Sequence, residues 1–276
     1  MTDTDIGYTR LKRVEGWLSW VDHAIFRTIV AGQAGRVAGA LAEIGVHHGK
    51  SFVPLAAASG ADGLYAIDLF EDQGANLDRS GKGDLARFEA TLAAFGIDRA
   101  RVTIDARPSS EVAPRDILDA VGPVRFFHID GGHHLDAVVN DIDLAVAVLH
   151  EDGVIAIDDV FRPEWPEVSM GAFGSRRLQE AGFACFAIGF NKAYFCRAPA
   201  VEIYRPLLEG HARLGCFLHK RYRVGERAIL VYQKCPLPEW SFPQVVAWYL
   251  GVYHPLTFLG LVPAVRRIRR GLSGRA

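Results

Sequence analysis

The sequence has almost no net charge, because its 276 residues include 31 lysines and arginines against 32 aspartates and glutamates. Proteins that bind nucleic acids through the phosphate backbone usually carry an excess of positive charge, so we expect no nucleic-acid partner. Cysteine is scarce as well: there are four, and no two of them form a C-x-x-C pair. This spacing does not suit a zinc site.

The polar N-terminus, MTDTDIGYTRLKR, contains no apolar signal segment, so we expect a cytoplasmic protein with reduced thiols. The sequence also has no internal repeat and no low-complexity linker. Half of its residues are hydrophobic and 23% are charged, which allows a full hydrophobic core. A chain of this length is expected to form one large domain, or one domain with appendages.

Short apolar segments alternate with amphipathic segments between residues 37 and 160. This alternation predicts an α/β fold: a doubly wound, mostly parallel, Rossmann-like sheet with helices on both faces. Two later apolar segments, 183–189 and 192–197, predict an antiparallel hairpin at one edge of that sheet. The five predicted parallel strands are residues 37–45, 63–70, 101–105, 124–130 and 153–159.

The regions flanking a predicted domain of residues 37–200 have different patterns. Residues 8–33 carry apolar side chains at steps of three and four, which predicts one amphipathic helix within an N-terminal helical segment, 1–36. Residues 201–276 are expected to be an appendage for oligomer, acceptor or membrane-surface contact. Within it, Trp240 to Val265 has no charged side chain apart from His254, three prolines argue against a spanning helix, and RRIRR follows. Burial, against the domain or in a homo-oligomer, is therefore preferred to weak contact with an anionic membrane surface.

A glycine-bearing turn follows the first predicted strand, in the stretch EIGVHHGKS. Its Gly45 and Gly49 would let backbone N–H groups approach a ligand, with Glu43 before them and Ser51 after. Asp68, at the end of the second strand, is placed to bind the two hydroxyls of a ribose. The pattern favours an adenosine-type ligand over simple turn chemistry. The dinucleotide fingerprint G-x-G-x-x-G is absent, so a nicotinamide cofactor is the second choice.

Three aspartates end the fourth and fifth predicted strands: Asp130, Asp158 and Asp159. Neighbouring carboxylates repel one another unless a cation lies between them, and Mg²⁺ prefers oxygen ligands of this kind. We therefore expect a shared divalent metal, the alternative being that Asp158 or Asp159 only caps the following turn. Adjacent strand residues point to opposite faces, so both can reach one ion only if the strand ends at Asp158.

A histidine, His133, follows Asp130 across two glycines. An imidazole there has the right pKa to take a proton from a hydroxyl group. His134 is the rival base, although it begins a predicted helix and is more simply explained as a capping or packing residue. His47 and His48 are expected to line the cofactor pocket or to face solvent.

Glu43-x-Gly45-x-x-x-Gly49, Asp68, IDGGHH and IDD together resemble the class I S-adenosylmethionine-dependent methyltransferases. More narrowly, they resemble the metal-dependent sugar O-methyltransferases of the macrocin O-methyltransferase type, over about residues 37–200. The stretch 69–84 resembles the acceptor-side loop of that group. The resemblance implies S-adenosylmethionine and Mg²⁺ as cofactors and a sugar or oligosaccharide hydroxyl as the acceptor.

The same resemblance implies roles for the residues. The donor's amino-acid end would lie at Glu43, Gly45 and Gly49, with Ser51 beside them, its ribose at Asp68 and its adenine near Asp105 and Ser109. Asp130, Asp158 and Asp159 would hold the metal, and His133, with Asp130, would be catalytic. The alternatives are an O-methyltransferase of a non-sugar vicinal diol, an NAD-dependent oxidoreductase, and a catalytically silent adenosine-ligand-binding module.

Overall fold

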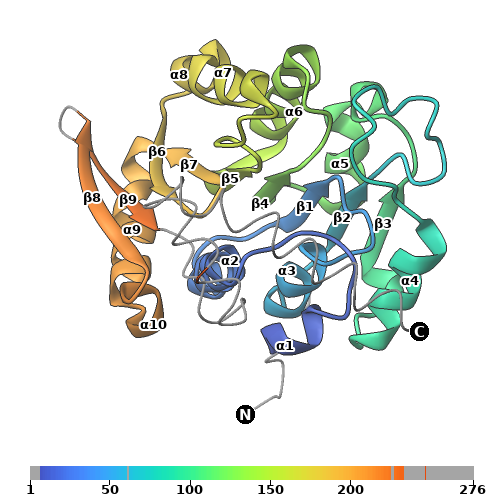
Figure 1. Cartoon of the computed structure of the whole chain (residues 1–276), viewed down its shortest axis with the longest axis horizontal. Helices are drawn as coiled ribbons and strands as arrows, with labels where there is room; N and C mark the ends of the chain where they lie inside the picture. The colour runs from blue at the N-terminus through green and yellow to red at the C-terminus, as the bar shows by residue number, and fades with distance from the viewer. Residues whose placement is uncertain (1–6, 61, 225–226, 233–245, 247–276) are drawn as a thin grey trace. The chain divides into compact units, whose positions relative to one another are not determined.

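The computed structural model describes residues 7–60, 62–224, 227–232 and Val246. Its described elements build one nine-stranded sheet in the order β3-β2-β1-β4-β5-β7-β6-β9-β8 (Figure 1). The five strands between residues 40 and 157 pair in parallel, while β7 runs antiparallel to both β5 and β6. The predicted doubly wound, mostly parallel α/β sheet with an antiparallel hairpin is therefore confirmed. The strands are β1 (Ala40–Ile44), β2 (Leu64–Ile67), β3 (Val102–Asp105), β4 (Val124–Ile129), β5 (Leu149–Ile157), β6 (Phe183–Ile188), β7 (Ala193–Arg197), β8 (Leu218–Val224) and β9 (Arg227–Tyr232).

Helices cover both faces of the sheet, as Figure 1 shows. The sheet separates two hydrophobic cores, one on each face. The separation follows from strand alternation: Phe126 packs into one core and its neighbour Phe127 into the other. One face is covered by α1 (Tyr8–Leu11), α2 (Trp20–Gln33), α3 (Phe52–Ala58), α4 (Leu85–Ala94), α9 (Val201–Gly210) and α10 (Ala212–Gly215). The other is covered by α5 (Pro114–Val121), α6 (Leu135–Val148), α7 (Pro166–Gly174) and α8 (Arg176–Glu180).

The single helix predicted over residues 8–33 is wrong. The chain forms α1 and α2 with a non-helical segment, residues 12–19, between them. Gly16 has φ +129°, a conformation that interrupts any helix, and Ser19 caps α2 by accepting a hydrogen bond from the Asp22 N–H. The apolar positions of the pattern, including Leu11 and Ile25, are nevertheless buried.

The sheet also continues beyond residue 200, where a separate appendage was expected to begin. Strand β9 pairs with β6, and β8 pairs with β9, so the hairpin β6–β7 lies inside the sheet. The described residues from 7 to 232 belong to one compact unit. The apolar stretch from Trp240 to Val265 and the arginines after it lie outside the described residues, apart from Val246. Among the helices that are described, none is long and apolar enough to cross a membrane.

The register of the central strands brings the predicted site residues to one edge. Ile44 pairs with Ile129 and Ile129 with Ile157, so β1, β4 and β5 end side by side. The next residues are linked as well, because the Asp130 N–H donates to the Ile44 carbonyl and the Asp158 N–H donates to the Ile129 carbonyl, both at 2.9 Å. The carboxyl ends of parallel strands are where such sheets bind ligands.

Candidate active site

A cavity of about 520 Å³ lies at this edge of the sheet. It is bordered by the turns after β1, β2, β4 and β5, by the 69–84 loop and by Trp17 from the segment between α1 and α2. The predicted site residues that line it are Gly45, Asp68, Ser109, Asp130, His133, Asp158 and Asp159. Glu43, Gly49, Ser51 and Asp105 are not among its lining residues.

The glycine turn requires glycine at its first position. Gly45 has φ +81°, and a Cβ atom there would lie 1.7 Å from the carbonyl oxygen of Asp130. The turn after β1 and the end of β4 are therefore in direct backbone contact. Gly49, with φ +90°, closes the turn against Phe88 of α4.

Glu43 and Ser51 lie beneath the turn. The Ser51 hydroxyl donates a hydrogen bond to Glu43 Oε1, and His128 Nδ1 lies 3.3 Å from the same oxygen. Burial raises the pKa of Glu43 to about 8, against the opposing effect of the Ser51 bond. Its carboxyl group is therefore protonated at neutral pH in the absence of a ligand, and its Oε2 atom has no hydrogen-bond partner among the described residues.

Asp68, the residue predicted to bind the ribose, lines the cavity. Its two carboxylate oxygens accept hydrogen bonds from the backbone N–H groups of His47 and Phe70, both at 2.7 Å. Gly83 of the 69–84 loop passes so close that a Cβ atom there would lie 2.4 Å from Asp68 Oδ1. Asp68 thus ties the glycine turn to the beginning of this loop while its side chain borders the cavity.

The adenine side predicted from Asp105 and Ser109 has a different arrangement. Asp105 accepts hydrogen bonds from the Arg107 guanidinium, at 2.7 and 3.0 Å, and from the Tyr65 hydroxyl at 2.8 Å. Arg107 is itself a lining residue, as is Ser109. Asp105 therefore borders the cavity only through Arg107.

The three predicted metal ligands fall into two groups that share Asp130. Ligand atoms of Asp130, His133 and Asp159 lie within 4.8 Å of one another, and so do those of His128, Asp130 and Asp158. Asp158 and Asp159 diverge because Asp159 adopts a left-handed conformation, φ +54°. The Asp158 carboxylate forms an ion pair with the buried Lys192, whereas Asp159 Oδ1 accepts a hydrogen bond from Asn191 at 2.7 Å.

His133 is held between two carboxylates. Its Nδ1 atom and its backbone N–H lie 2.8 and 2.7 Å from Asp78 Oδ2, and its Nε2 atom lies 3.1 Å from Asp159 Oδ2. Trp165 stacks on the imidazole ring at a centroid distance of 4.5 Å. Burial alone would lower the pKa of His133, but the bonds to Asp159 and Asp78 outweigh it and raise the pKa to about 9. His134, the rival base, is the N-cap residue of α6 and makes no side-chain capping bond.

Three functional residues were missed in the sequence. Asp78 lies in the 69–84 loop, which resembled an acceptor-side loop without indicating which residue reaches the site. Asn191 and Lys192 lie in the turn of the predicted hairpin, and no local sequence signal distinguishes a buried lysine in such a turn from an exposed one. Each of them contacts a partner 32 or more residues away in the sequence.

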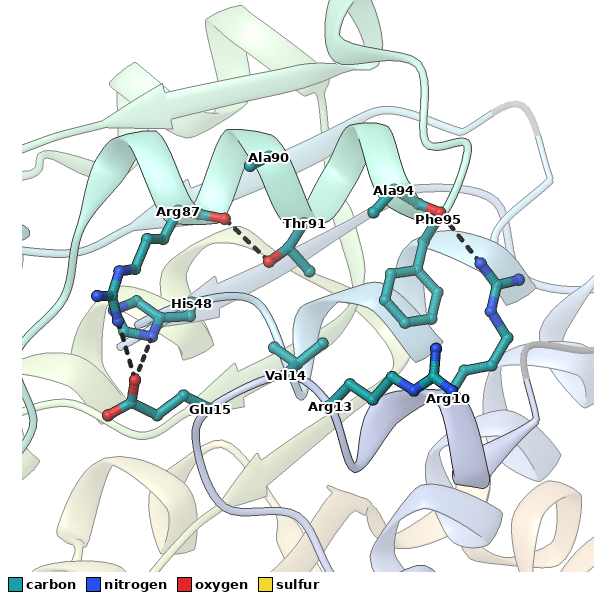
Figure 2. A pocket seen from close by; sticks show the side chains of 10 residues that line it. All are labelled: Arg10, Arg13, Val14, Glu15, His48, Arg87, Ala90, Thr91, Ala94 and Phe95. Atoms are coloured by element: carbon teal, nitrogen blue, oxygen red, sulfur yellow. Dashed lines mark hydrogen bonds and ion pairs between the residues drawn. The ribbon is translucent and has the colours of Figure 1, made fainter.

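A second cavity, of about 470 Å³, lies behind the glycine turn (Figure 2). It lies between α4 and the segment that contains Arg10 and Glu15. Arg10 donates a hydrogen bond to the Ala94 carbonyl at 3.1 Å, and Glu15 pairs with Arg87 at 3.0 Å and with His48 at 3.5 Å. These contacts hold the segment in place, and Trp17 of the same segment lines the main cavity.

The chain was compared with known proteins. Residues 42–160 match a family model described as a methyltransferase domain. The fold is similar to that of the O-methyltransferase NovP, with 14% identity and a TM-score of 0.55 over 64% of this chain and 79% of NovP. It is also similar to the methyltransferase PaMTH1 of Podospora anserina, solved with S-adenosylhomocysteine, at 11% identity and a TM-score of 0.52 over 69% and 85% of the two chains.

A third similar structure is CalS11, described as a TDP-rhamnose 3'-O-methyltransferase of calicheamicin biosynthesis. It is 18% identical, with a TM-score of 0.48 over 63% of this chain and 76% of CalS11. No curated protein matches the sequence. At these identities the likeness to NovP and PaMTH1 shows a shared fold alone.

Proposed function

We propose that this chain is a class I S-adenosylmethionine-dependent methyltransferase that methylates a hydroxyl group of a sugar or oligosaccharide with the help of Mg²⁺. The match of residues 42–160 to a methyltransferase-domain model supports the reaction class. The observation that carries the proposal is the position of His133. Its Nε2 atom faces Asp159 in a cavity that also contains Asp130 and the glycine turn. Methyl transfer to oxygen requires a base for the hydroxyl proton, and the cavity provides one beside the predicted donor site.

The donor set fits a hard divalent cation. Asp130 is half-buried, and no hydrogen bond to its carboxylate is found among the described residues. Desolvation raises the pKa of this carboxyl group. A cation bound by Asp130 and Asp159 would stabilise the charged form of both carboxylates. Asp158 is a third carboxylate close to Asp130. When bound, Mg²⁺ would lower the pKa of an acceptor hydroxyl.

The residues of this chain supply the remaining steps. With a cation bound at Asp159, the bond between that carboxylate and Nε2 would be lost, so the pKa of His133 would fall from about 9 and the ring would become neutral. Asp78 fixes the neutral ring through Nδ1, which leaves Nε2 to accept the hydroxyl proton. Gly45 lets the turn after β1 pack against the Asp130 backbone, at the edge of the cavity where the donor is proposed to bind. The acceptor oxygen then attacks the sulfonium methyl carbon, the methyl–sulfur bond breaks, and S-adenosylhomocysteine leaves. Holding the reactants in this geometry accounts for much of the rate.

The sugar acceptor is supported by the resemblance of the site motifs to the macrocin type. A non-sugar vicinal diol presents the same pair of oxygens to a cation, and an acceptor panel separates the two. The methyltransferase domain favours this reading over an NAD-dependent oxidoreductase. A silent ligand-binding module has no use for a histidine fixed by two carboxylates, and any turnover would eliminate it.

The experiment combines donor binding with turnover. Binding of S-adenosylhomocysteine and of NAD is measured by calorimetry, and methyl transfer to a panel of sugars and vicinal diols is measured with Mg²⁺ or with chelator. We expect His133→Ala and Asp130→Ala to abolish transfer and to bind S-adenosylhomocysteine nearly as the unmodified protein does. His219→Ala, on the exposed strand β8, is the matched control. Full activity in His133→Ala would refute the role of this residue.

A further inference from the structure

The turn between β6 and β7 sends two adjacent side chains to the two aspartates that end β5. Asn191 donates a hydrogen bond to Asp159 Oδ1 at 2.7 Å, and Lys192 forms an ion pair with Asp158. The turn itself is fixed, because the Val160 N–H donates to the Asn191 carbonyl at 2.9 Å. A segment outside the family-matched region 42–160 therefore positions the carboxylates of the predicted cation site.

Lys192 is an unusual residue for this position. Its side chain is about 2% exposed, and a buried ammonium group is costly unless it is paired with an anion. The nearby Asp22 has other partners, since it accepts hydrogen bonds from the hydroxyls of Ser19 and Tyr194, both at 2.7 Å. The direct anionic partner of Lys192 is Asp158, at the edge of the cavity.

The formal charges explain what this ion pair does. The charge of protonated His133 is balanced by that of its partner Asp78. Asp130, Asp158 and Asp159 carry three further negative charges, and Lys192 supplies one positive charge, so two negative charges remain for a divalent ion to balance. All three aspartates line the cavity. Asp159 shares a ligand group with Asp130 and His133, whereas Asp158 belongs to the group with His128 and is paired with the lysine.

We propose that Lys192 is a positioning residue: it holds Asp158 as a fixed ion pair and thereby matches the net charge of the cation site to a divalent ion. Asp130 and Asp159 then hold the cation directly, and Asp158 acts through its charge. The proposal rests on the proposed function, because both use the same aspartates. It is tested without donor or acceptor, so a failure of methyl transfer leaves its outcome unaffected.

The test measures the binding of Mn²⁺ by electron paramagnetic resonance and of Tb³⁺ by luminescence, each ion alone, on the full-length chain. Four variants are compared with the unmodified protein: Lys192→Met, Lys192→Arg, Asp158→Asn, and the double variant Lys192→Met with Asp158→Asn. The readout is the ratio of the affinities for Tb³⁺ and Mn²⁺, two ions that differ in charge. If Lys192 had only a structural role, replacing it would not change this ratio in a charge-dependent way.

We expect Lys192→Met to raise this ratio by at least about tenfold, since it adds one uncompensated negative charge near the ion. Asp158→Asn should weaken Mn²⁺ binding by about tenfold, and Lys192→Arg should change little. The double variant restores the charge balance and should return both values to within about threefold of those of the unmodified protein.

The double variant also covers the case in which Lys192→Met does not fold because Asp158 is left buried and unpaired. Melting curves from circular dichroism show which variants are folded. The proposal is overturned if the double variant binds Mn²⁺ as weakly as Asp158→Asn, or if folded Lys192→Met leaves the ratio unchanged. Absence of Mn²⁺ binding in the unmodified protein overturns it too, whereas methyl transfer with and without chelator decides the proposed function separately.

Discussion

Replacing Asp78 by asparagine tests how the candidate base is positioned. The substitution keeps the shape of the side chain and removes its negative charge. In the unmodified protein this charge stabilises the protonated His133 ring. The rise of the His133 pKa from 6.5 to about 9 corresponds to about 3 kcal/mol in favour of the protonated form. Since Asp159 and Asp78 share this effect, we expect Asp78→Asn to lower the pKa of His133 by about one unit or more.

The same substitution predicts a pH-dependent loss of stability. The pKa of His133 is higher in the folded protein than its ordinary value, so the stabilisation is complete below about pH 6.5 and disappears as the pH rises through about 9. Asp78→Asn should therefore lower the free energy of unfolding by about 1.5 kcal/mol at pH 6.5, and by much less at pH 10.

Two measurements check these values. Histidine-selective NMR follows the titration of the His133 ring, and urea unfolding at pH 6.5 and pH 10 gives the stability. Asp72→Asn, an exposed position in the same loop, is the control and should change neither. A His133 pKa that stays near 9 in Asp78→Asn, or an equal loss of stability at both pH values, would contradict the argument.

Two further substitutions test the framework around the cavity, each by thermal and urea unfolding. Gly45→Ala should unfold the protein or lower its free energy of unfolding by several kcal/mol, because the new Cβ atom would lie 1.7 Å from the Asp130 carbonyl oxygen. Gly60→Ala is the control: Gly60 also has positive φ but lies in open space, so the loss should be only about 1 kcal/mol. Similar losses of stability at the two positions would contradict the close approach at Gly45. Arg125→Met should cost about 3 kcal/mol or more, since the buried guanidinium donates to Asp62 at 2.8 Å and to three further acceptors, and a loss below 1 kcal/mol would show that these bonds add little.

The sheet and the cavity edge were predictable because their signals are local. Each central strand is a short apolar segment, and the polar residues that follow it, such as Asp68 and Asp130, reach the same edge whatever the details of packing. The positions of Asp158 and Asp159 were less predictable. The sequence places them side by side, whereas the left-handed backbone at Asp159 sends them to different partners.

The residues that were missed contact the site from distant parts of the sequence. Asp78 and His133 are separated by 55 positions in the sequence, and Lys192 and Asp158 by 34, so no periodic pattern links them. The helix predicted over residues 8–33 is interrupted at Gly16. A glycine lowers the stability of a helix only slightly, so the regular spacing of apolar residues outweighed it in the prediction.

The two ends of the cavity are supported by different parts of the chain. The side predicted to bind the donor is built by the turns after β1 and β2, with the Asp130 backbone packed on Gly45. The opposite side is built by the 69–84 loop, by Trp165 and by the β6–β7 turn. If the proposed function holds, mutations that reshape these surface loops should change acceptor preference and leave the predicted donor site intact. Related chains could diverge in what they modify without rebuilding the sheet, and an engineer seeking a new acceptor should begin in the same loops.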